Sequence, residues 1–299
     1  MDNRIFNYRM EFYRQTYADS PLWLGKKSLE GKRLIIYCEQ GRGDTIQFIR
    51  YASVLKKQGC HIIVACSENL HCLLPYIDGV DEWYNKANTD LPTHDFHVLS
   101  LDLPFLVLDS GVDINKWWEG KEPESYMPQV TAAIPDTPYI NFTEQVNMEE
   151  AELPPGTNIG IAWEGNPSHW NNADRSCPLK YFRNLSGNLF SLQKDIHKEY
   201  IEDCDDIVLM GSELNDFKDT LRLINAMDVV VTVDTVILHL AGALNKMTCA
   251  LLGNEPDMRW GGKKSPWYPS VSFYRRDGDW DSVFDQFQIN YVPKQKTGI

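Results

Sequence analysis

No stretch of this 299-residue chain approaches the roughly 20 consecutive apolar residues that a membrane-spanning helix needs. The opening MDNRIFNYRMEFYR is charged and aromatic, unlike a secretory signal, so we expect a cytoplasmic protein. The seven cysteines form no CxxC pair, and several lie in apolar, strand-like runs. This placement indicates reduced, buried thiols rather than a disulfide framework.

The chain also lacks a basic stripe. Lys and Arg number 29 against 42 Asp and Glu, which gives a net charge of −13. Such a surface repels phosphate backbones at long range, which argues against non-specific nucleic-acid binding but leaves a local basic groove open. There is no low-complexity run and no repeat of 20 to 50 residues. DCDD at 203–206 fits the metal-binding DxD pattern loosely and is interpreted as a solvated loop, so we expect no metal site.

Short, continuous apolar runs bounded by turn residues are present, and they alternate with helical periodicity. This pattern is typical of strands buried on both faces of a parallel sheet, joined by right-handed crossovers. In the first half we predict strands at 32–39, 60–67, 80–84 and 94–104, with helices at 4–18, 45–59 and 68–77. In the second half we predict strands at 157–165, 188–193, 206–210, 228–234, 247–253 and 271–276, with helices at 216–227, 235–246 and 279–288.

Prolines accumulate and periodicity fades between about 117 and 155, which indicates a domain boundary near 150. The sequence therefore predicts an α/β protein of two Rossmann-like domains, 1–150 with a leading helix and 151–299. Ligands of open α/β sheets lie beyond the carboxyl ends of the strands, so the loops at these ends are the candidate sites.

The first candidate loop follows the first strand and reads EQGRGDT. Gly41 and Gly43 allow a tight turn and close approach of a ligand, Arg42 lies between them, and the following helix start offers amides to an anion. The alternative is a plain strand-to-helix turn with Asp44 as N-cap.

The second candidate loop, 163–176, is long for such a connection, and long ordered loops are often functional. Gly165 and Asn166 open it, and Arg175 could clamp a diphosphate. His169 could also bond a phosphate, or it could be a satisfied loop histidine.

The third candidate loop begins at Asp234, which ends a buried strand. Thr235 and His239 are four residues apart and share one helix face. The helix start and the Thr235 hydroxyl would receive a phosphate well. Alternatively, Asp234 caps the helix and His239 belongs to the core.

These loops, in this order, resemble a known family. The matching stretches run from SPLWLGKKSLEGKRLIIYCEQGRGDTIQFIRYA through GIAWEGNPSHWNNADRSCPL and DFKDTLRLINAMDVVVTVDTVILHLAGALNK to SPWYPS and GDW. The sequence is similar to the glycosyltransferase domain that follows tetratricopeptide repeats in many bacterial proteins. That domain is related to heptosyltransferases and more remotely to O-linked N-acetylglucosamine transferase. The repeats themselves are absent here.

The resemblance implies a GT-B fold, in which an acceptor-side N-terminal domain and a nucleotide-sugar-binding C-terminal domain face each other across a cleft. It implies that Asp44 is the general base. It further implies donor binding by a group that spans both domains: Gly41, Arg42, Gly43, Gly165, Asn166, His169, Arg175, Gln193, Asp234, Thr235 and His239.

Three positions depart from the family pattern. Val236 and Ile237 are bulkier than the small residues expected after Asp-Thr, and Arg42 replaces a small or apolar residue. All three could reshape the sugar or acceptor pocket.

We therefore predict inverting, metal-independent transfer from a nucleotide-sugar, with a UDP-sugar as the first guess from base rate and with no resident cofactor. The acceptor is unknown: a glycan, protein, small molecule or modified nucleic acid. Two alternatives stay open, a non-catalytic nucleotide or nucleotide-sugar binder and a transferase acting on modified DNA bases.

Overall fold

The computed structural model describes residues 20–88, 90–107, 134–143, 153–194, 196 and 205–290. The chain divides into two compact units, Met1–Asn141 and Phe142–Ile299. The predicted boundary near residue 150 and the predicted helix at 4–18 lie outside the described residues. Within the described ranges, no helix is both long and apolar enough to span a bilayer.

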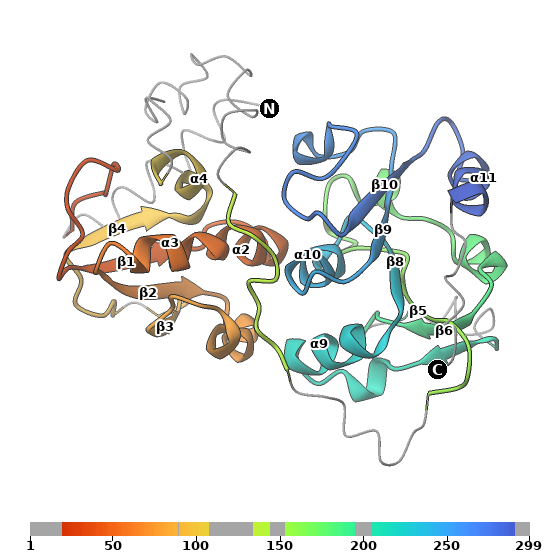
Figure 1. Ribbon diagram of the computed structural model, residues 1–299, viewed down its shortest axis with the longest axis horizontal. Coiled ribbons are helices and arrows are strands. Elements are labelled where there is room, and N and C mark those ends of the chain that lie inside the picture. Colours follow the sequence, from red (N-terminus) through yellow and green to blue (C-terminus); the bar gives the residue numbers. More distant parts are fainter. Residues whose placement is uncertain are drawn as a thin grey trace, which may run out of the picture. The chain divides into compact units, whose positions relative to one another are not determined.

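The N-terminal unit contains a sheet of four parallel strands in the order β3-β2-β1-β4 (Figure 1). The strands are β1 (Arg33–Tyr37), β2 (His61–Cys66), β3 (Glu82–Asn85) and β4 (Phe96–Leu99). The middle of β1 and nearly all of β2 and β4 are buried, which explains why their sequences are continuous apolar runs rather than alternating ones.

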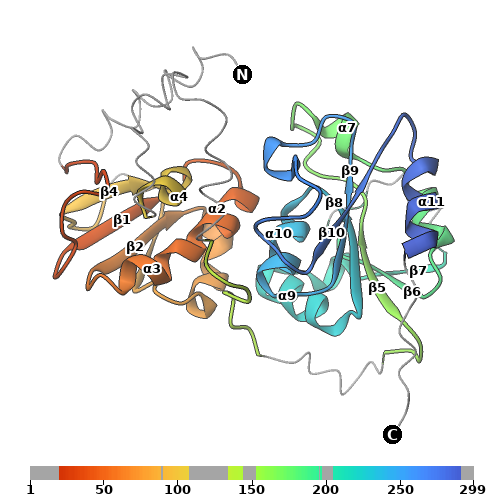
Figure 2. The same ribbon diagram turned by 45° about the horizontal axis from the view of Figure 1, so that its top comes forward.

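The helices of this unit differ in detail from the prediction. The predicted helix at 45–59 starts earlier and is broken into α2 (Arg42–Phe48), the 3₁₀ turn η1 (Ile49–Tyr51) and α3 (Ala52–Lys56). These pieces lie against one face of the sheet (Figure 2). The predicted helix at 68–77 is a 3₁₀ helix, η2 (Glu68–Tyr76), which contains Pro75; proline has no N–H for an α-helical bond.

The predicted strand at 94–104 is shorter than expected. It ends at Leu99 and continues as the 3₁₀ turn η3 (Ser100–Asp102) and the helix α4 (Leu103–Leu106). Pro104 lies in the first turn of α4, where its missing N–H costs nothing.

The C-terminal unit contains six parallel strands in the order β10-β9-β8-β5-β6-β7. The strands are β5 (Asn158–Ala162), β6 (Asn188–Ser191), β7 (Ile207–Leu209), β8 (Val229–Val233), β9 (Thr248–Leu252) and β10 (Val271–Arg275). This is the Rossmann strand order, in which the chain reverses direction of winding between its first and fourth strands, here β5 and β8.

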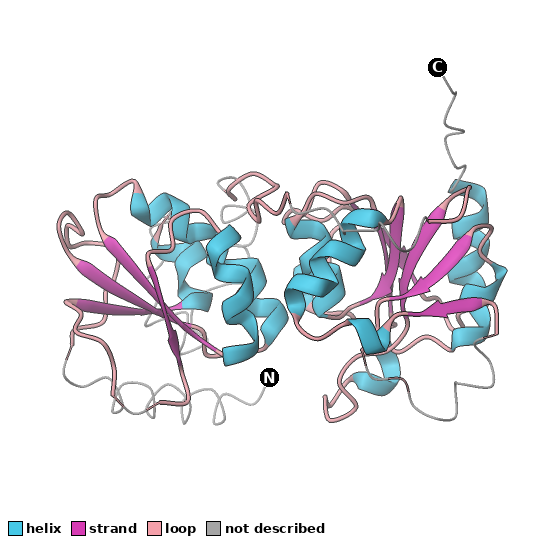
Figure 3. Cartoon of the chain, turned by 90° about the horizontal axis from the view of Figure 1, so that it is seen from below, coloured by secondary structure: helices cyan, strands magenta, loops and turns pink. Residues whose placement is uncertain are grey.

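Helices cover both faces of this sheet, with α9 and α10 on one side and α11 on the other (Figure 3). The helical segments are α7 (Asn172–Arg175), η5 (Leu179–Asn184), η6 (Gly211–Glu213), α9 (Phe217–Ala226), α10 (Val236–Ala243), η7 (Met258–Trp260) and α11 (Asp281–Asn290). One apolar core, which includes Ile161, Val231 and Leu251, packs the centre of the sheet against η5 and α11. The two parallel sheets confirm the predicted fold class.

Candidate functional site

The winding reversal between β5 and β8 places two of the three predicted loops side by side, because these strands are neighbours and run in parallel. The loop after β5 begins at Trp163, and the loop after β8 is the two-residue connection Asp234-Thr235. The loop after β9 leaves the same edge, since β9 pairs with β8. The candidate site of the C-terminal unit is built on this edge.

Arg175 bridges the two loops at the reversal point. Its Nη1 donates to the Asp234 carbonyl at 3.2 Å, and its Nε donates to Asn172 Oδ1 at 3.3 Å. The guanidinium lies over Gly165: a Cβ added to that glycine would be 2.2 Å from Arg175 Nη2. Burial lowers the pKa of Arg175, and the Asp234 charge acts in the opposite direction. The predicted pair Gly165 and Arg175 therefore forms one packed unit.

Asp174 anchors the loop that carries Arg175. Its carboxylate accepts from the backbone N–H groups of Asn254 at 3.3 Å and Glu255 at 3.0 Å, and it forms an ion pair with Arg276. A Cβ on Gly253 would lie 2.3 Å from Asp174 Oδ2. The end of the long loop is thus fixed to the segment that follows β9.

Asn166 and His169 form the turn in the middle of this loop. Asn166 Oδ1 accepts from the Ser168 N–H at 3.0 Å, and the Asn166 carbonyl accepts from the His169 N–H at 3.0 Å. His169 Nδ1 accepts from the Asn171 N–H at 3.2 Å, which leaves Nε2 to carry the proton of the neutral ring. The Asn171 amide reaches the Glu255 carbonyl at 3.0 Å. These contacts hold the loop in shape, and a role in donor binding stays a prediction.

Thr235, rather than Asp234, caps α10. Its hydroxyl accepts from the Ile237 N–H at 3.2 Å. The alternative reading of Asp234 as the cap is therefore wrong, because the cap position lies one residue later. The Leu238 N–H donates to the Thr235 carbonyl at 3.1 Å, and the positive end of the helix dipole here favours an anion.

The Asp234 carboxyl lies among charged groups from two loops. Burial raises the pKa of this carboxyl, and the Asp257 charge also raises it. The pKa is lowered by Arg259, by the indole N–H of Trp260 and by Arg175. Arg259 itself pairs with Asp257, its Nε 2.8 Å from Asp257 Oδ1. Asp257 and Arg259 follow β9 and were missed from the sequence; the signal that could have found them is their position beyond a buried strand.

His239 is 3% exposed and lies inside the unit. Its Nδ1 is 3.0 Å from the Tyr268 hydroxyl, and its ring lies 5.5 Å from that of Trp260. Gly242 makes room for this arrangement, since a Cβ there would be 2.4 Å from the Tyr268 ring. His239 is thus packed as a core residue, and donor contact by it stays a prediction.

Gln193 follows β6 at the same edge. Its Oε1 accepts from the N–H groups of Trp163 at 2.7 Å and Glu164 at 2.9 Å. The side chain therefore supports the start of the loop after β5.

The first predicted loop belongs to the N-terminal unit. Gly41 is the N-cap of α2, and Asp44 occupies the third helical position, so the reading of Asp44 as the N-cap is wrong by three residues. The Asp44 carboxylate accepts from the Gly41 N–H at 3.0 Å, while Arg42 is exposed and Gly43 half-buried. The general-base role of Asp44 stays a prediction.

Glu39, which also follows β1, was missed. It accepts from the Ser100 hydroxyl at 2.9 Å and from the N–H groups of Ser100 and Leu101 at 3.1 and 3.2 Å. Burial raises its pKa, while these contacts lower it. Glu39 ties the ends of the neighbouring strands β1 and β4 together.

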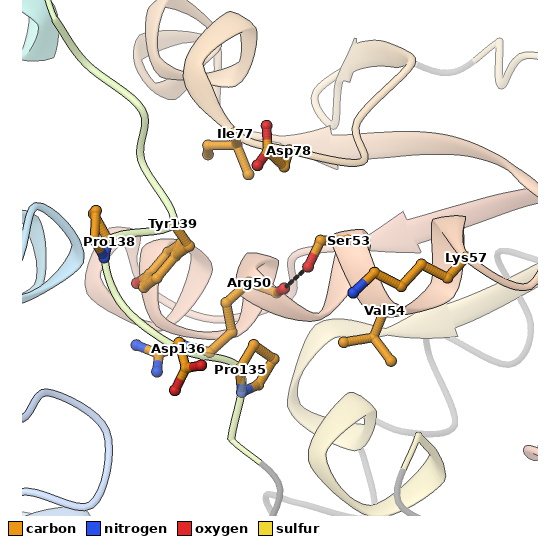
Figure 4. Close-up of a pocket in the computed structure, with 10 residues that line it drawn as sticks. All are labelled: Arg50, Ser53, Val54, Lys57, Ile77, Asp78, Pro135, Asp136, Pro138 and Tyr139. Atoms are coloured by element: carbon orange, nitrogen blue, oxygen red, sulfur yellow. Dashed lines mark hydrogen bonds between the residues drawn. The ribbon is translucent and has the colours of Figure 1, made fainter.

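A cavity of about 330 Å³ lies elsewhere in the N-terminal unit, between α3 and the segment 135–139 (Figure 4). Arg50 lines it, stacked 4.4 Å from the Tyr139 ring, and none of the predicted site residues does. In the part of the chain that the structure describes, no three His, Cys, Asp or Glu side chains gather as metal ligands would.

Residues 189–280 match the model of glycosyltransferase family 9 (heptosyltransferase). The matched stretch lies wholly in the C-terminal unit and includes Gln193, Asp234, Thr235, His239 and Arg259. No curated protein sequence matches the chain.

Solved structures share the fold over most of the chain. The family 9 glycosyl transferase from Veillonella parvula is 12% identical, with a TM-score of 0.56 over 89% of this chain and 93% of that one. E. coli heptosyltransferase WaaC with ADP is 12% identical, with a TM-score of 0.54 over 87% and 100%. The iron-containing dodecameric glycosyltransferase TibC from E. coli is 13% identical, with a TM-score of 0.51 over 91% and 71%.

These likenesses confirm the predicted GT-B fold. Together with the family match they support a glycosyltransferase. The association with tetratricopeptide repeats stays a prediction.

Proposed function

We propose that the chain transfers a sugar from a nucleotide-sugar to an acceptor hydroxyl. The observation that carries the proposal is the edge of the C-terminal sheet. There Arg175 bridges the loops after β5 and β8 beside the start of α10, within a unit that carries the family 9 match. A half-buried guanidinium beside the positive end of a helix suits a diphosphate, the leaving group of a nucleotide-sugar.

The donor nucleotide is the least determined part of the proposal. UDP is favoured by base rate alone, whereas WaaC was solved with ADP and with ADP-2-deoxy-2-fluoro heptose. ADP and UDP are therefore the first two nucleotides to compare.

The proposed reaction is a direct displacement with inversion. The acceptor oxygen forms a bond to the anomeric carbon, and its proton passes to the Asp44 carboxylate. The bond from that carbon to the diphosphate oxygen breaks, and its electron pair stays on the nucleoside diphosphate. The sugar passes through an oxocarbenium-like state, as in glycoside hydrolysis.

We further propose that no metal ion is needed, because Arg175, the Thr235 hydroxyl and the helix-start amides meet the charge on the leaving group. TibC is described as iron-containing, so this point needs its own test. The test is whether chelation by EDTA changes nucleotide binding.

The first experiment is a thermal-shift screen with UDP, GDP, ADP, dTDP and CMP, with and without EDTA. A ligand that binds only the folded state raises stability by about 2.7 kcal/mol at 100 times its dissociation constant. We expect one nucleoside diphosphate to shift the melting temperature selectively, with EDTA present or absent. No shift with any nucleotide would contradict the proposal, and a shift lost in EDTA would contradict metal independence.

The second experiment tests Asp44. We expect Asp44→Asn to abolish release of nucleoside diphosphate from the donor identified in the screen, and to leave donor affinity within a few-fold. Asp219→Asn is the matched control, because Asp219 is likewise the third residue of its helix, α9, and accepts from a backbone N–H just before that helix, that of Asn215 at 3.0 Å. Residual turnover with weakened donor binding would refute the base assignment. Donor binding without turnover in the wild-type chain would favour the non-catalytic alternative.

A further inference from the structure

Arg259 is a second arginine at the edge where Arg175 lies. It sits in η7, in the segment that follows β9, and β9 is the neighbour of β8. Asp257 holds it by three bonds: the Arg259 N–H and Nε donate to Oδ1 at 2.9 and 2.8 Å, and Nη2 donates to Oδ2 at 3.2 Å. A guanidinium held this way has lost much of the rotamer freedom that an exposed arginine retains.

The two members of this pair differ in exposure. The Arg259 side chain is 19% exposed, whereas that of Asp257 is 38% exposed. The carboxylate is therefore on the solvent side of the pair, and the guanidinium is on the protein side, 5.8 Å from the Trp260 ring. Asp257 therefore holds the Arg259 side chain against the protein.

The residue on which both arginines act is Asp234. Among the groups that lower the pKa of its buried carboxyl, Arg259 is the strongest, and Arg175 acts on it too. Two guanidinium groups from different loops, one after β5 and one after β9, thus act on the residue just before the N-cap of α10. The neighbouring Trp260, fully buried, acts on this carboxyl through its indole N–H, and its ring lies 5.5 Å from the ring of His239 in α10.

We propose that Arg259 is a second anion-binding residue, which holds the diphosphate of the donor at the start of α10 together with Arg175. The proposal rests on the proposed function. Each guanidinium presents parallel N–H groups that match two phosphate oxygens, and α10 follows β8, the strand that lies between β5 and β9. Asp257 is a positioning residue, and Asp234 holds the two cations in place until the anion arrives.

The second cation has a defined part in the transfer. When the bond between the sugar and the diphosphate breaks, its electron pair adds charge to the terminal phosphate. Two fixed cations stabilise that charge better than one, because neither has to move at the moment of reaction.

The test is calorimetric titration of the whole chain with ADP, UDP and inorganic pyrophosphate. Pyrophosphate carries the proposed contacts without base or sugar. We expect Arg259→Gln to weaken binding of pyrophosphate and of the preferred nucleotide by a similar factor, about 10- to 100-fold, and Arg259→Lys to weaken it less. Asp257→Asn should weaken binding less than Arg259→Gln, because the charge remains.

Arg222→Gln is the matched control. Arg222 lies in the same unit, is half-buried and pairs with Asp219 at 2.7 Å, but it belongs to α9. We expect it to leave both affinities unchanged. Melting temperatures of all variants separate folding from binding.

An Arg259→Gln variant that melts lower but binds pyrophosphate and nucleotide within threefold of wild type would overturn the proposal, since Arg259 would then be a structural ion pair only. Loss of nucleotide affinity with unchanged pyrophosphate affinity would also overturn it, by placing Arg259 at the nucleoside. Failure of the proposed function looks different: the wild-type chain itself would bind none of the three ligands.

Discussion

At the scale of single residues, the position of Arg175 depends on the missing side chain of Gly165. Gly165 has no side chain, and the space beside its Cα is filled by the Arg175 guanidinium. The bonds from Arg175 to Asp234 and Asn172 then fix the charge at the start of α10. One glycine thus determines where one cation lies.

We expect Gly165→Ala to lower nucleotide affinity about tenfold while the melting temperature changes little. The new methyl group would meet the tip of a flexible side chain, so the arginine moves and the fold does not. Titration with nucleotide and a melting curve measure the two effects. Gly262→Ala is the control, because its Cβ would meet no side chain and only the Lys264 carbonyl oxygen, at 3.3 Å. Unchanged affinity would show that Arg175 does not hold the nucleotide from this position.

His97 is a residue whose protonation opposes folding. It is 6% exposed on β4, and its Nδ1 lies 3.0 Å from the Ser20 hydroxyl. Burial, with help from the nearby His94, lowers its pKa to about 4. The unfolded chain takes up this proton near pH 6.5, so stability is lost as the pH falls from about 6.5 to 4, by about 3 kcal/mol if the shift is fully realised.

Urea unfolding between pH 7 and 4 checks this prediction. We expect the wild-type chain to lose stability more steeply over that window than His97→Asn, since the variant has no titrating ring. Carboxyl groups contribute equally to both proteins. Parallel pH profiles would mean that His97 is protonated without cost.

At the scale of elements, the strands were the most predictable part. β1, β5, β8 and β9 are short apolar runs between turn residues, and burial on both faces leaves such a run few other structures. The type of helix was less predictable. In η2, Pro75 and the short length of the segment favour a 3₁₀ helix over an α-helix.

The candidate site was predicted in part for the same reason. Loops that follow buried strands can be found from the sequence, and they contain Arg175, Asp234 and Thr235. Sequence spacing does not reveal that Gln193 supports the Trp163 backbone or that Arg259 acts on Asp234, since those contacts depend on strand order.

The loop after β5 should be ordered chiefly by its last turn. We expect Asp174→Asn to speed amide hydrogen exchange in residues 166–176 and to weaken nucleotide binding, because the ion pair with Arg276 is lost and the bonds to the backbone N–H groups of Asn254 and Glu255 become weaker. Asp206→Asn, which breaks the exposed pair with Arg183, is the control. Unchanged exchange in 166–176 would contradict this role.

At the scale of the whole molecule, charge limits the choice of acceptor. The net charge of −13 disfavours approach of a nucleic-acid backbone, and this bears on the alternative that modified DNA bases are the acceptor.

We expect a dissociation constant for unmodified duplex DNA above about 10⁻⁴ M at about 150 mM salt. This is weaker than the binding typical of non-specific DNA-binding proteins. An electrophoretic mobility shift with increasing protein tests this, with the same titration at low salt as the comparison. Micromolar binding at the higher salt would return a DNA acceptor to first consideration.

The anchor at Asp174 also has a genetic consequence. Arg276 follows β10, and its ion pair with Asp174 connects it to the turn that carries Arg175. A substitution at Arg276 should therefore weaken substrate binding, as a substitution in the site itself would, although we expect no contact between Arg276 and the substrate. Combined with Asp174→Asn it should add little further loss, since both act through one link. In a mutational scan, pairs of substitutions with non-additive effects would identify the residues that hold the site in place.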